Sequence, residues 1–487
     1  MWFSTDPATS RFGMLTQKLI YLSQDSKMHI LKIFNLNAHS VSISEHSTIC
    51  TLLNIFIILL LVVSILATAN SFHPSYAQKE RQQVKLTVLF VDPEARWKTL
   101  VPPALQELRA RHPDLDIQVN YTIYPYNEAR THMLKSMANR TPVDLISLDQ
   151  IWLGEFANKS YIVDLTDRAM SWGKLSDWYQ ANLDGNVYND KIYGIWAWTD
   201  VRSIWYWKDL LNQTGVDPSS LKTWDGYIDS AKKLNSALGQ QGRHGVELVG
   251  GPGSQNEWYP FLWMQGGDIL QIKSGHPTKG SYWFPTYNST EGVKALEFFR
   301  QLVDNANVKP ITINFEKEFA NKKYAVMLGG SWVPGQFLPL TKRSFEQKIG
   351  MIPMFPVPTK STPTSTIMGG WLLSIPQASK NKDLTWELIT ILLKPEILSP
   401  MLAKYGYLPT QIPIGEGRYS TELRKSIPYY DDLISLISSG HSRSNIPEYP
   451  QIADQIREAV DNVYAGSKTP KQALDDAVAK SAKVLGW

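Results

Sequence analysis

The alternation of strand and helix signals that begins near residue 84 constrains the fold of this chain more than any other feature. Short apolar runs alternate with segments whose apolar residues recur at helical spacing. In chain order the segments are a strand "VKLTVLFV" (84–91), a helix that Pro113 ends, a strand "IQVNYTIY" (117–124), a helix "NEARTHMLKSMA" (127–138) and a strand "VDLISL" (143–148). This order predicts a parallel sheet with helices on both faces, which binds ligands beyond the carboxyl ends of its strands.

A second alternating region indicates a second lobe. The chain has 487 residues, whereas single hydrophobic cores stop growing near about 250 to 300 residues. After the second region, "PVPTKSTPTST" (356–366) suits a connector, "GGWLLSIP" restarts with a strand, and residues 450–484 form two helical patterns. The second region, 203–354, contains the strands "SIWYW", "VELVGG", "YAVMLGG" and "IGMIPMF" and helices near 224–238, after Asn256 and at 290–304. The sequence therefore predicts an α/β protein of two lobes.

An apolar run near the N-terminus predicts export. Residues 52–69 read "LLNIFIILLLVVSILATA", which is marginal in length for a spanning helix and ample for a signal-peptide core. A small-residue cleavage site follows at Ala77, so we expect residues 1–77 to be an N-terminal extension with a cleaved signal peptide, or alternatively a membrane anchor. The only cysteine, Cys50, precedes the run, so neither disulfides nor a lipid-modified cysteine after the run are expected.

Composition and missing motifs exclude several functions. The net charge of +4 comes from interspersed residues of both signs, so no nucleic-acid partner is expected. The chain has no phosphate-binding loop, no H-E-x-x-H, no G-x-S-x-G and no dinucleotide fingerprint, which weighs against the common NTPase, hydrolase and dehydrogenase chemistries. The nine histidines are scattered without zinc-ligand spacing. We therefore expect no metal and no cofactor.

Polar and aromatic residues follow the predicted strands at their carboxyl ends. Asp92 and Glu94 come after the first strand, and Asp149 and Trp152 come after the third. In parallel sheets ligands bind beyond this edge, so these residues are candidates for ligand binding.

The segment "YGIWAWTDVRSIWYWKDLL" (193–211) gathers aromatic residues around one acid and one base. Side chains of an extended chain alternate, so Trp196, Trp198, Asp200 and Arg202 are expected on one face, with ordinary core on the other. Any single tryptophan here is equally well explained as part of a half-buried strand, because strands favour aromatic residues. The run as a whole suits a flat, polar ligand.

Glycine next to tryptophan recurs in two further stretches. These are "GGSWVPG" (329–335) and "GGWLLSIP" (369–376), joined by "NEWYPFLWMQGGDIL" (256–270). Glycine permits close backbone approach, indoles stack on the C–H faces of sugar rings, and neighbouring acids accept hydrogen bonds from hydroxyls. The pattern suits a carbohydrate, although each stretch alone is also typical of a turn with a core tryptophan.

The chain resembles the extracellular solute-binding proteins of sugar ABC transporters, the group that contains the maltose- and trehalose/maltose-binding proteins. The resemblance covers about residues 84–487. It rests on landmarks in family order, namely "PVDLISLDQIWLGEFANKSYIVDLT", "YGIWAWTDVRSIWYWKDLL", "TWDGYIDSAKKL", "WMQGGDIL", "YAVMLGGSW", "GGWLLSIPQASKNKDLTWELI", "YGYLPT" and "IPEYPQIADQIREAV". The sequence departs from some maltose binders at Leu148, where those have an aromatic residue, and it lacks the usual lipoprotein cysteine.

The resemblance implies a two-lobe periplasmic-binding-protein fold in which the chain crosses between the lobes three times. The N-lobe would comprise 84–199 and 357–408, and the C-lobe 203–354 and 412–487. A hinge would close both lobes over a ligand in the cleft between them. By matching, the substrate-binding residues would be Asp149 as a hydroxyl acceptor, Trp332 and Trp371 as stacking platforms, Trp198 and Asp200 in the cleft, and Asp92, Glu94, Asn256, Glu257 and Trp258 as weaker candidates.

The expected function is that of an exported binding protein, not an enzyme. It would capture a sugar, most simply a disaccharide or oligosaccharide, and deliver it as a monomer to the permease subunits of an ABC transporter at the cell surface or in the periplasm. Two alternatives remain open from the residues alone. A secreted glycosidase would share the aromatic cleft but need two acids at catalytic separation, and a surface adhesion module would lack a buried ligand site.

Overall fold

The computed structural model describes residues 57–58, 81–312, 315–338 and 340–487. Contacts divide the chain between Glu80 and Arg81, and the fold below is that of Arg81–Trp487. Except for Ile57 and Ile58, the apolar run at 52–69 lies outside the described residues, as do Cys50 and the cleavage site at Ala77. In the described part of the chain, no helix has both the length and the apolar character required to cross a bilayer.

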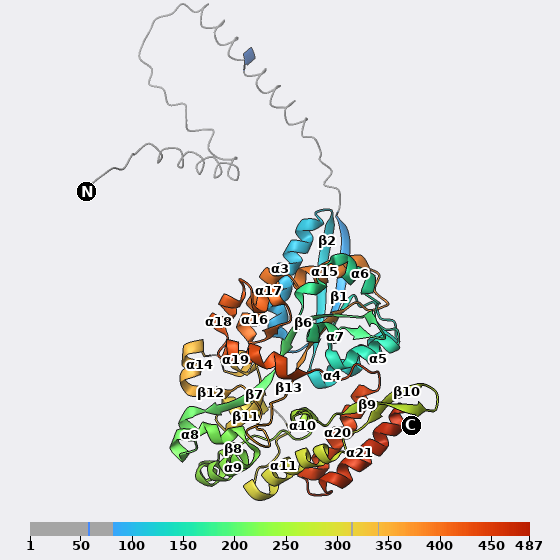
Figure 1. The fold of residues 1–487 in the computed structure, drawn as a ribbon. Coiled ribbons are helices and arrows are strands. Elements are labelled where there is room, and N and C mark those ends of the chain that lie inside the picture. Colours follow the sequence, from blue (N-terminus) through green and yellow to red (C-terminus); the bar gives the residue numbers. More distant parts are fainter. Residues whose placement is uncertain (1–56, 59–80, 313–314, 339) are drawn as a thin grey trace, which may run out of the picture. The chain divides into compact units, whose positions relative to one another are not determined.

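Two sheets form the centres of two lobes (Figure 1). We call the lobe around the six-stranded sheet, of order β15-β6-β14-β3-β1-β2, the N-lobe, and the lobe around the four-stranded sheet, of order β12-β7-β11-β8, the C-lobe. The N-lobe strands are β1 (Gln82–Val91), β2 (Leu115–Tyr124), β3 (Leu145–Asp149), β6 (Ile195–Asp200), β14 (Gly369–Ser374) and β15 (Leu408–Pro409). The C-lobe strands are β7 (Arg202–Trp207), β8 (His244–Val246), β11 (Tyr324–Gly330) and β12 (Ile349–Ile352). Three two-stranded ribbons pair β4 (Val187–Tyr188) with β5 (Lys191–Ile192), β9 (Leu270–His276) with β10 (Gly280–Pro285), and β13 (Thr366–Ile367) with β16 (Gly440–His441).

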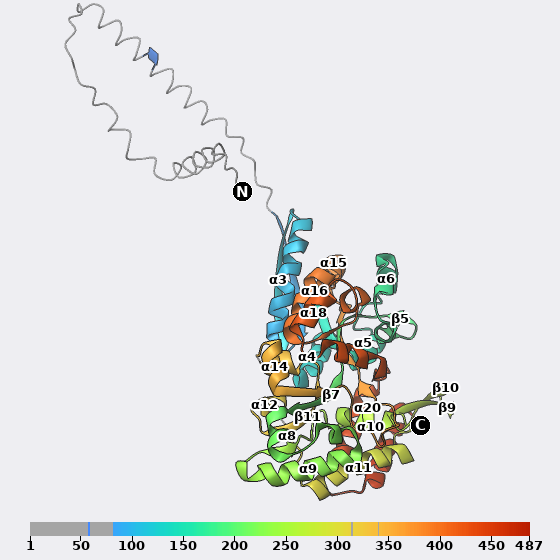
Figure 2. The ribbon, with the colours of Figure 1, turned by 60° about the vertical axis from the view of Figure 1, so that its left-hand side comes forward.

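Helices cover both sheets, and Figure 2 shows α3, α15 and α16 together in one lobe and α8, α9 and α11 in the other. Up to residue 263 they are α3 (Glu94–Arg111), α4 (Tyr126–Ala138), α5 (Leu153–Asn158), α6 (Thr166–Trp172), α7 (Gln180–Asp184), α8 (Lys208–Thr214), α9 (Trp224–Leu238) and α10 (Ser254–Trp263). The others are α11 (Thr290–Ala306), α12 (Phe315–Ala320), α13 (Val333–Phe337), α14 (Lys342–Lys348), α15 (Lys382–Leu392), α16 (Pro395–Tyr405), α17 (Ile412–Gly415), α18 (Ser420–Ser426), α19 (Tyr430–Ser435), α20 (Tyr449–Tyr464) and α21 (Pro470–Leu485).

The strands and helices expected from the sequence are present, but two strands differ in extent. The sequence predicts a strand over residues 246–251, whereas β8 ends at Val246 and Val249 makes only an isolated bridge to Ile311. The strand expected over residues 349–355 ends at Ile352. Local signals fix the long helices. Thr223 caps α9 by accepting from the Gly226 amide, and Thr469 opens α21 with a reciprocal capping box.

The sheets are mixed, whereas the strand–helix alternation predicts parallel ones. In the N-lobe, β1 is parallel to β2 and β3, but β14 runs antiparallel to both β3 and β6. In the C-lobe, β7 is antiparallel to β11 and β12. These antiparallel strands are the ones that enter a sheet directly from the other lobe, so no crossover helix imposes a parallel direction on them.

The chain passes between the two lobes three times. The first passage, from β6 to β7, is the single residue Val201. The second leads from β12 through β13 to β14, and the third leads from β15 through β16 to α20, which packs on α10 and α21. Because β13 pairs with β16, the second and third passages lie side by side.

A bulge in β6 breaks the alternation expected along the aromatic run. The register between β14 and β6 shifts between Trp371 and Leu372, which lie opposite Trp198 and Trp196, so Ala197 is an extra residue. Strict period-two alternation is therefore wrong at this point. Trp198 packs against the rings of Trp97 and Tyr407, whereas the Trp196 ring lies where a side chain at Gly185 or Gly370 would be.

Candidate functional site

Asp149 is a buried N-lobe acid whose carboxylate accepts from three donors. It ends β3 and is 6 % exposed. Its Oδ2 accepts a hydrogen bond of 2.8 Å from the Tyr126 hydroxyl, and its Oδ1 accepts from the Ile151 amide at 3.3 Å and from Arg443 Nη2 at 3.3 Å. A buried carboxylate held by three donors is fixed in position and stays a strong hydrogen-bond acceptor.

Asp200 ends β6 at the first passage between the lobes. It is 8 % exposed, and within the described chain its Oδ1 has no hydrogen-bond partner. Burial raises the pKa of its carboxyl to about 6, although Arg202 and Arg443, and more weakly Arg96, act in the opposite direction. Gly369 lies opposite it, and a Cβ there would come within 2.9 Å of Asp200 Oδ2. A side chain at position 369 would therefore displace this carboxylate.

Strand register places Trp371 beside Asp149, two residues along β14 from Gly369, which lies opposite Asp200. Trp371 on β14 lies opposite Asp149 on β3 and opposite Trp198 on β6. The Trp371 indole is half-buried. It meets the rings of Tyr126 and Trp152 edge-on, at centroid distances of 6.1 and 6.3 Å.

Arg96 forms the base of this aromatic group. It is 1 % exposed, and its guanidinium carbon lies 4.7 Å from the Trp371 ring centroid and 5.3 Å from that of Trp198. Its Nη1 donates to the Tyr407 hydroxyl at 3.0 Å, and its Nη2 donates to the Val91 carbonyl at 2.9 Å. A cation so enclosed supports one face of Trp371 and brings positive charge toward Asp200.

The C-lobe contributes Arg202 and Trp332. Arg202 begins β7 opposite Gly330 on β11, and its guanidinium carbon lies 5.6 Å from the centroid of the half-buried Trp332 ring. The Trp332 ring lies across Gly330, where a Cβ would come within 2.0 Å of it. Burial raises the pKa of the Glu316 carboxyl, although a hydrogen bond with Trp332 and the charge of Arg202 act in the opposite direction.

Arg443 joins the two halves of this group. It lies in the third passage and is 7 % exposed. One guanidinium nitrogen reaches Asp149, and the other, Nη1, donates to Asn256 Oδ1 on α10 of the C-lobe at 3.4 Å. We call the set that these contacts bring together, Asp149, Asp200, Arg202, Arg443, Trp332 and Trp371, the interlobe site.

The structure distributes the sequence-predicted residues unevenly around this site. Asn256 reaches it through Arg443, and Asp92 is exposed at its N-lobe edge, where partial desolvation raises the pKa of its carboxyl and the charge of Arg96 acts in the opposite direction. Glu94 is exposed and pairs with Lys98 at 3.0 Å. Three candidates are almost fully buried: Trp198 packs in the N-lobe, and Glu257 and Trp258 lie inside the C-lobe.

Sequence reasoning did not select Tyr126, Arg96 or Arg443. Tyr126 follows β2 as Asp92 follows β1, so the strand-end argument applied to every strand would have found it. Arg96 lies on the first turns of α3 and Arg443 in a loop, and neither position has a distinctive local pattern.

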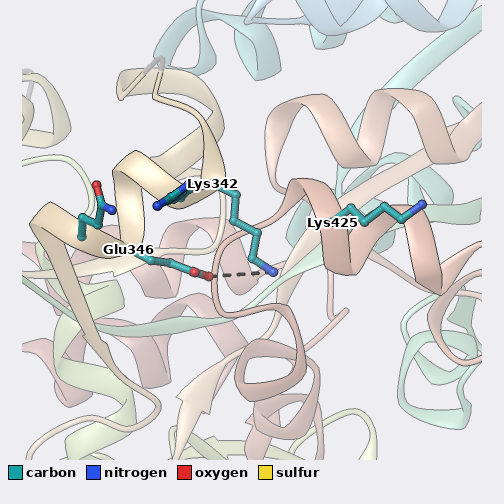
Figure 3. Close-up of a pocket in the computed structure, with 5 residues that line it drawn as sticks. Lys342, Glu346 and Lys425 are labelled. Carbon is teal, nitrogen blue, oxygen red and sulfur yellow. Dashed lines mark ion pairs between the residues drawn. The ribbon is translucent and has the colours of Figure 1, made fainter.

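A second concave region lies away from the interlobe site. A polar pocket of about 420 Å³ lies between α14 and α18 and is lined by Lys342, Arg343, Glu346, Gln347 and Lys425 (Figure 3). It shares no residue with the interlobe site. In the described ranges no three His, Cys, Asp or Glu side chains are grouped so that they could hold a metal ion.

Two α/β lobes joined by three passages, with charged and aromatic side chains where the lobes meet, define a two-lobe ligand-binding protein. Residues 93–397 match the family model described as bacterial extracellular solute-binding protein. That match spans more than half of the chain, which therefore belongs to this family. The finding confirms the resemblance seen in the sequence.

Known proteins support the same class. The arabinooligosaccharide-binding protein of Bacillus subtilis is 23 % identical over 394 residues, covering 77 % of this chain and 86 % of that protein. A solute-binding protein of an ABC transporter from Thermotoga lettingae, bound to α-D-tagatose, superposes with a TM-score of 0.70 at 22 % identity, covering 82 % of this chain and 100 % of that one. A maltose-bound protein of T. maritima gives a TM-score of 0.69 at 23 % identity and covers 82 % and 99 %. These likenesses confirm the two-lobe fold.

Proposed function

We propose that the protein binds a sugar, most simply a disaccharide or oligosaccharide, between its lobes and delivers it to the permease of an ABC transporter. The observation that carries this proposal is the interlobe site itself, where the carboxylates of Asp149 and Asp200 alternate with the guanidinium groups of Arg202 and Arg443. A sugar hydroxyl donates one hydrogen bond and accepts others, so it can bridge a carboxylate and a guanidinium.

The indoles fit the same ligand class. Trp332 on the C-lobe and Trp371 on the N-lobe are both half-buried, unlike Trp198, which is enclosed in the N-lobe core. Ring faces of this kind pack against the apolar C–H faces of sugars while the acids take the hydroxyls. The relatives named above bind arabinooligosaccharides, tagatose and maltose, which supports the assignment to a carbohydrate.

Burial of the site implies that the lobes separate before ligand enters. Asp149, Asp200 and Arg443 are each less than 9 % exposed, so in this conformation a sugar in solution cannot reach them. We infer that the three passages form the hinge and that a ligand contacting both lobes shifts the population toward the closed state.

The proposed setting is outside the cytoplasm. Membership of an extracellular family supports this location, and we propose that residues 52–69 direct export or hold the protein at the membrane. We propose further that it works as a monomer, because the interlobe site is assembled from one chain.

A thermal-shift screen followed by calorimetry tests the proposal. Monosaccharides, disaccharides and oligosaccharides should include at least one that raises the melting temperature, with amino acids, phosphate and peptides as controls. Small-angle scattering should then show a smaller radius with that sugar. Hydrolysis of an oligosaccharide that one Asp or Glu substitution abolishes would contradict the binding-protein assignment. Stabilisation by a control compound alone would contradict a sugar as the ligand.

A further inference from the structure

The residue with the least sequence signal in the interlobe site, Arg443, is the one that both lobes contact. It lies between β16 and α20, in the third passage, and neither end of this loop belongs to either main sheet. The loop nevertheless has a defined position, for which the N-lobe is responsible.

Backbone contacts fix the loop to the N-lobe. The Gln150 side chain donates to the Arg443 carbonyl at 2.9 Å and also to Asn445 Oδ1. Asn445 Nδ2 donates in turn to the carbonyls of Gly185 at 3.1 Å and Val187 at 3.0 Å. The helix α5 comes so close that a Cβ at Gly154 would lie 1.5 Å from the Asn445 carbonyl oxygen. The N-lobe therefore determines where the Arg443 side chain begins.

The side chain then extends across the lobe boundary. Its Nη2 pairs with Asp149 Oδ1 at 3.3 Å in the N-lobe, and its Nη1 donates to Asn256 Oδ1 at 3.4 Å in the C-lobe. The other groups that face it are Asp200 and the hydroxyls of Tyr126 and Tyr449. Because the guanidinium is planar and presents several N–H donors in a fixed fork, it can hold both partners at once, which a lysine ammonium does less well.

We propose that Arg443 is a positioning residue that links the lobes directly, so that it favours the closed conformation before any ligand is bound and holds Asp149 in the orientation that accepts a hydroxyl. The second part rests on the function proposed above, whereas the first part does not. The pair with Asp149 lies within the N-lobe, so the contact that opening breaks is the hydrogen bond from Arg443 Nη1 to Asn256. That hydrogen bond opposes opening, because the guanidinium and the amide both lose a partner. Arg443 would then determine the fraction of ligand-free molecules that is closed.

The test measures lobe separation without ligand. In the full chain with Cys50→Ser, no native cysteine remains, so Lys135→Cys on α4 and Lys294→Cys on α11 give one exposed spin-label position on each lobe. Double electron–electron resonance measures the distance between the two spin labels. It should show that Arg443→Gln lowers the ratio of closed to open molecules by about tenfold or more. Arg443→Lys should give an intermediate ratio.

Three further variants separate positioning from a general structural role. Arg168→Gln removes an ion pair with Asp383 inside the N-lobe and should leave the distance distribution unchanged. Gln150→Leu should open the lobes by releasing the loop while the arginine remains. Asp149→Asn combined with Arg443→Gln should open them no further than Arg443→Gln alone.

An unchanged distance distribution in a folded Arg443→Gln protein overturns the proposal. If Arg443→Gln does not fold, the distributions of Arg443→Lys and Gln150→Leu decide in the same way. Since no sugar is present in the measurement, this failure is distinguishable from a failure of the proposed function, which the ligand screen detects.

Discussion

Two pairs of buried acids lie on either side of the lobe boundary, and they differ in the charges that surround them. Asp149 and Asp200 at the interlobe site face Arg96, Arg202 and Arg443. Glu247 and Glu257 lie inside the C-lobe, both 2 % exposed, and in the described part of the chain no lysine or arginine nitrogen comes within ion-pair distance of either.

The difference decides which acids can act as ligands at neutral pH. Burial raises the pKa of Glu257 to about 8 and that of Glu247 well above its usual value, in part because each faces another carboxyl group. The three arginines hold the pKa of Asp200 at about 6 despite similar burial. The charge of Arg202 also acts on Glu247 and Glu257, but there burial outweighs it, whereas three guanidinium groups act on Asp200 and keep it ionised and able to accept from hydroxyls.

The largest effect on sugar binding is expected for Asp149→Ala. The change removes a hydroxyl acceptor and leaves Arg443 as a buried charge without its carboxylate, so affinity should fall by about 3 kcal/mol or more, on the order of a hundredfold. Calorimetry with the sugar found in the screen measures this. The matched control is Glu257→Gln, which should change affinity by less than about twofold. An equal loss of affinity in both variants would show that the interlobe acids and the C-lobe acids do not differ in their role in binding.

A smaller loss is expected for the tryptophan that lies beside the aspartates. Trp371→Ala should weaken binding by about 1 to 3 kcal/mol with a nearly normal melting temperature, and Trp332→Ala should behave similarly. Trp258 adjoins Glu257 in sequence and is fully buried, so Trp258→Ala should instead cost about 3 to 5 kcal/mol of stability. The melting temperature without ligand and the affinity for sugar separate a tryptophan that stacks on the ligand from one that packs in the core. A large melting loss in Trp371→Ala would identify it as a core residue.

Asp200→Asn should raise the stability of the protein and weaken its binding of sugar. The pKa of Asp200 is raised from 3.8 to about 6 in the folded protein, so its contribution to stability is greatest below pH 3.8 and is lost as the pH rises through 6. At pH 7 the amide should therefore stabilise the protein by about 1 to 3 kcal/mol while affinity falls about tenfold. Denaturant unfolding at pH 7 and pH 3.5 measures the gain, which should disappear at the lower pH. Wild-type affinity should likewise fall as the pH drops through 6, and a pH-independent affinity would argue against hydroxyl binding by this carboxylate.

The smallest effect on binding is expected for Glu257→Gln. This variant should instead change how the free energy of unfolding depends on pH. Its folded-state pKa of about 8 lies above the ordinary 4.5, so wild-type stability should decline as the pH rises from about 4.5 through 8. The stability of the glutamine variant should decline less over this pH range, and the variant should bind sugar normally throughout. Parallel stability curves for the two proteins would show that this acid is not protonated in the native state.

Most of the secondary structure could be predicted, because hydrophobic periodicity is a local property. The expected strand at 84–91 is β1 (Gln82–Val91), and the helices expected near 224–238 and 290–304 are α9 and α11. The antiparallel entry of β14 and the bulge at Ala197 could not be predicted, since both depend on which strands pair across more than 150 residues of sequence.

The candidate site was predictable only in part, for the same reason. Asp149 follows from a strand end and, like Asp200 and Trp371, from the family resemblance, and the structure brings the three together. Glu257 and Trp258 are weaker candidates from the aromatic stretch 256–270 and the resemblance, and the structure places them on α10 in the C-lobe interior. Residue type and order in the chain do not say which face of a helix the core of its lobe will cover.

The sequence by itself determined the two-lobe α/β fold, the family and the abundance of tryptophan beside acids, because apolar periodicity, chain length and residue order are properties of the chain alone. Only the tertiary structure decided which charges share a site. Arg96, Arg202 and Arg443 are separated by up to 347 positions in sequence, yet the charges of all three act on Asp200. Coulomb forces and desolvation depend on distance and burial in space, so the pairing of cation with acid, and with it the ionisation of each buried carboxyl, arises only when the lobes have packed.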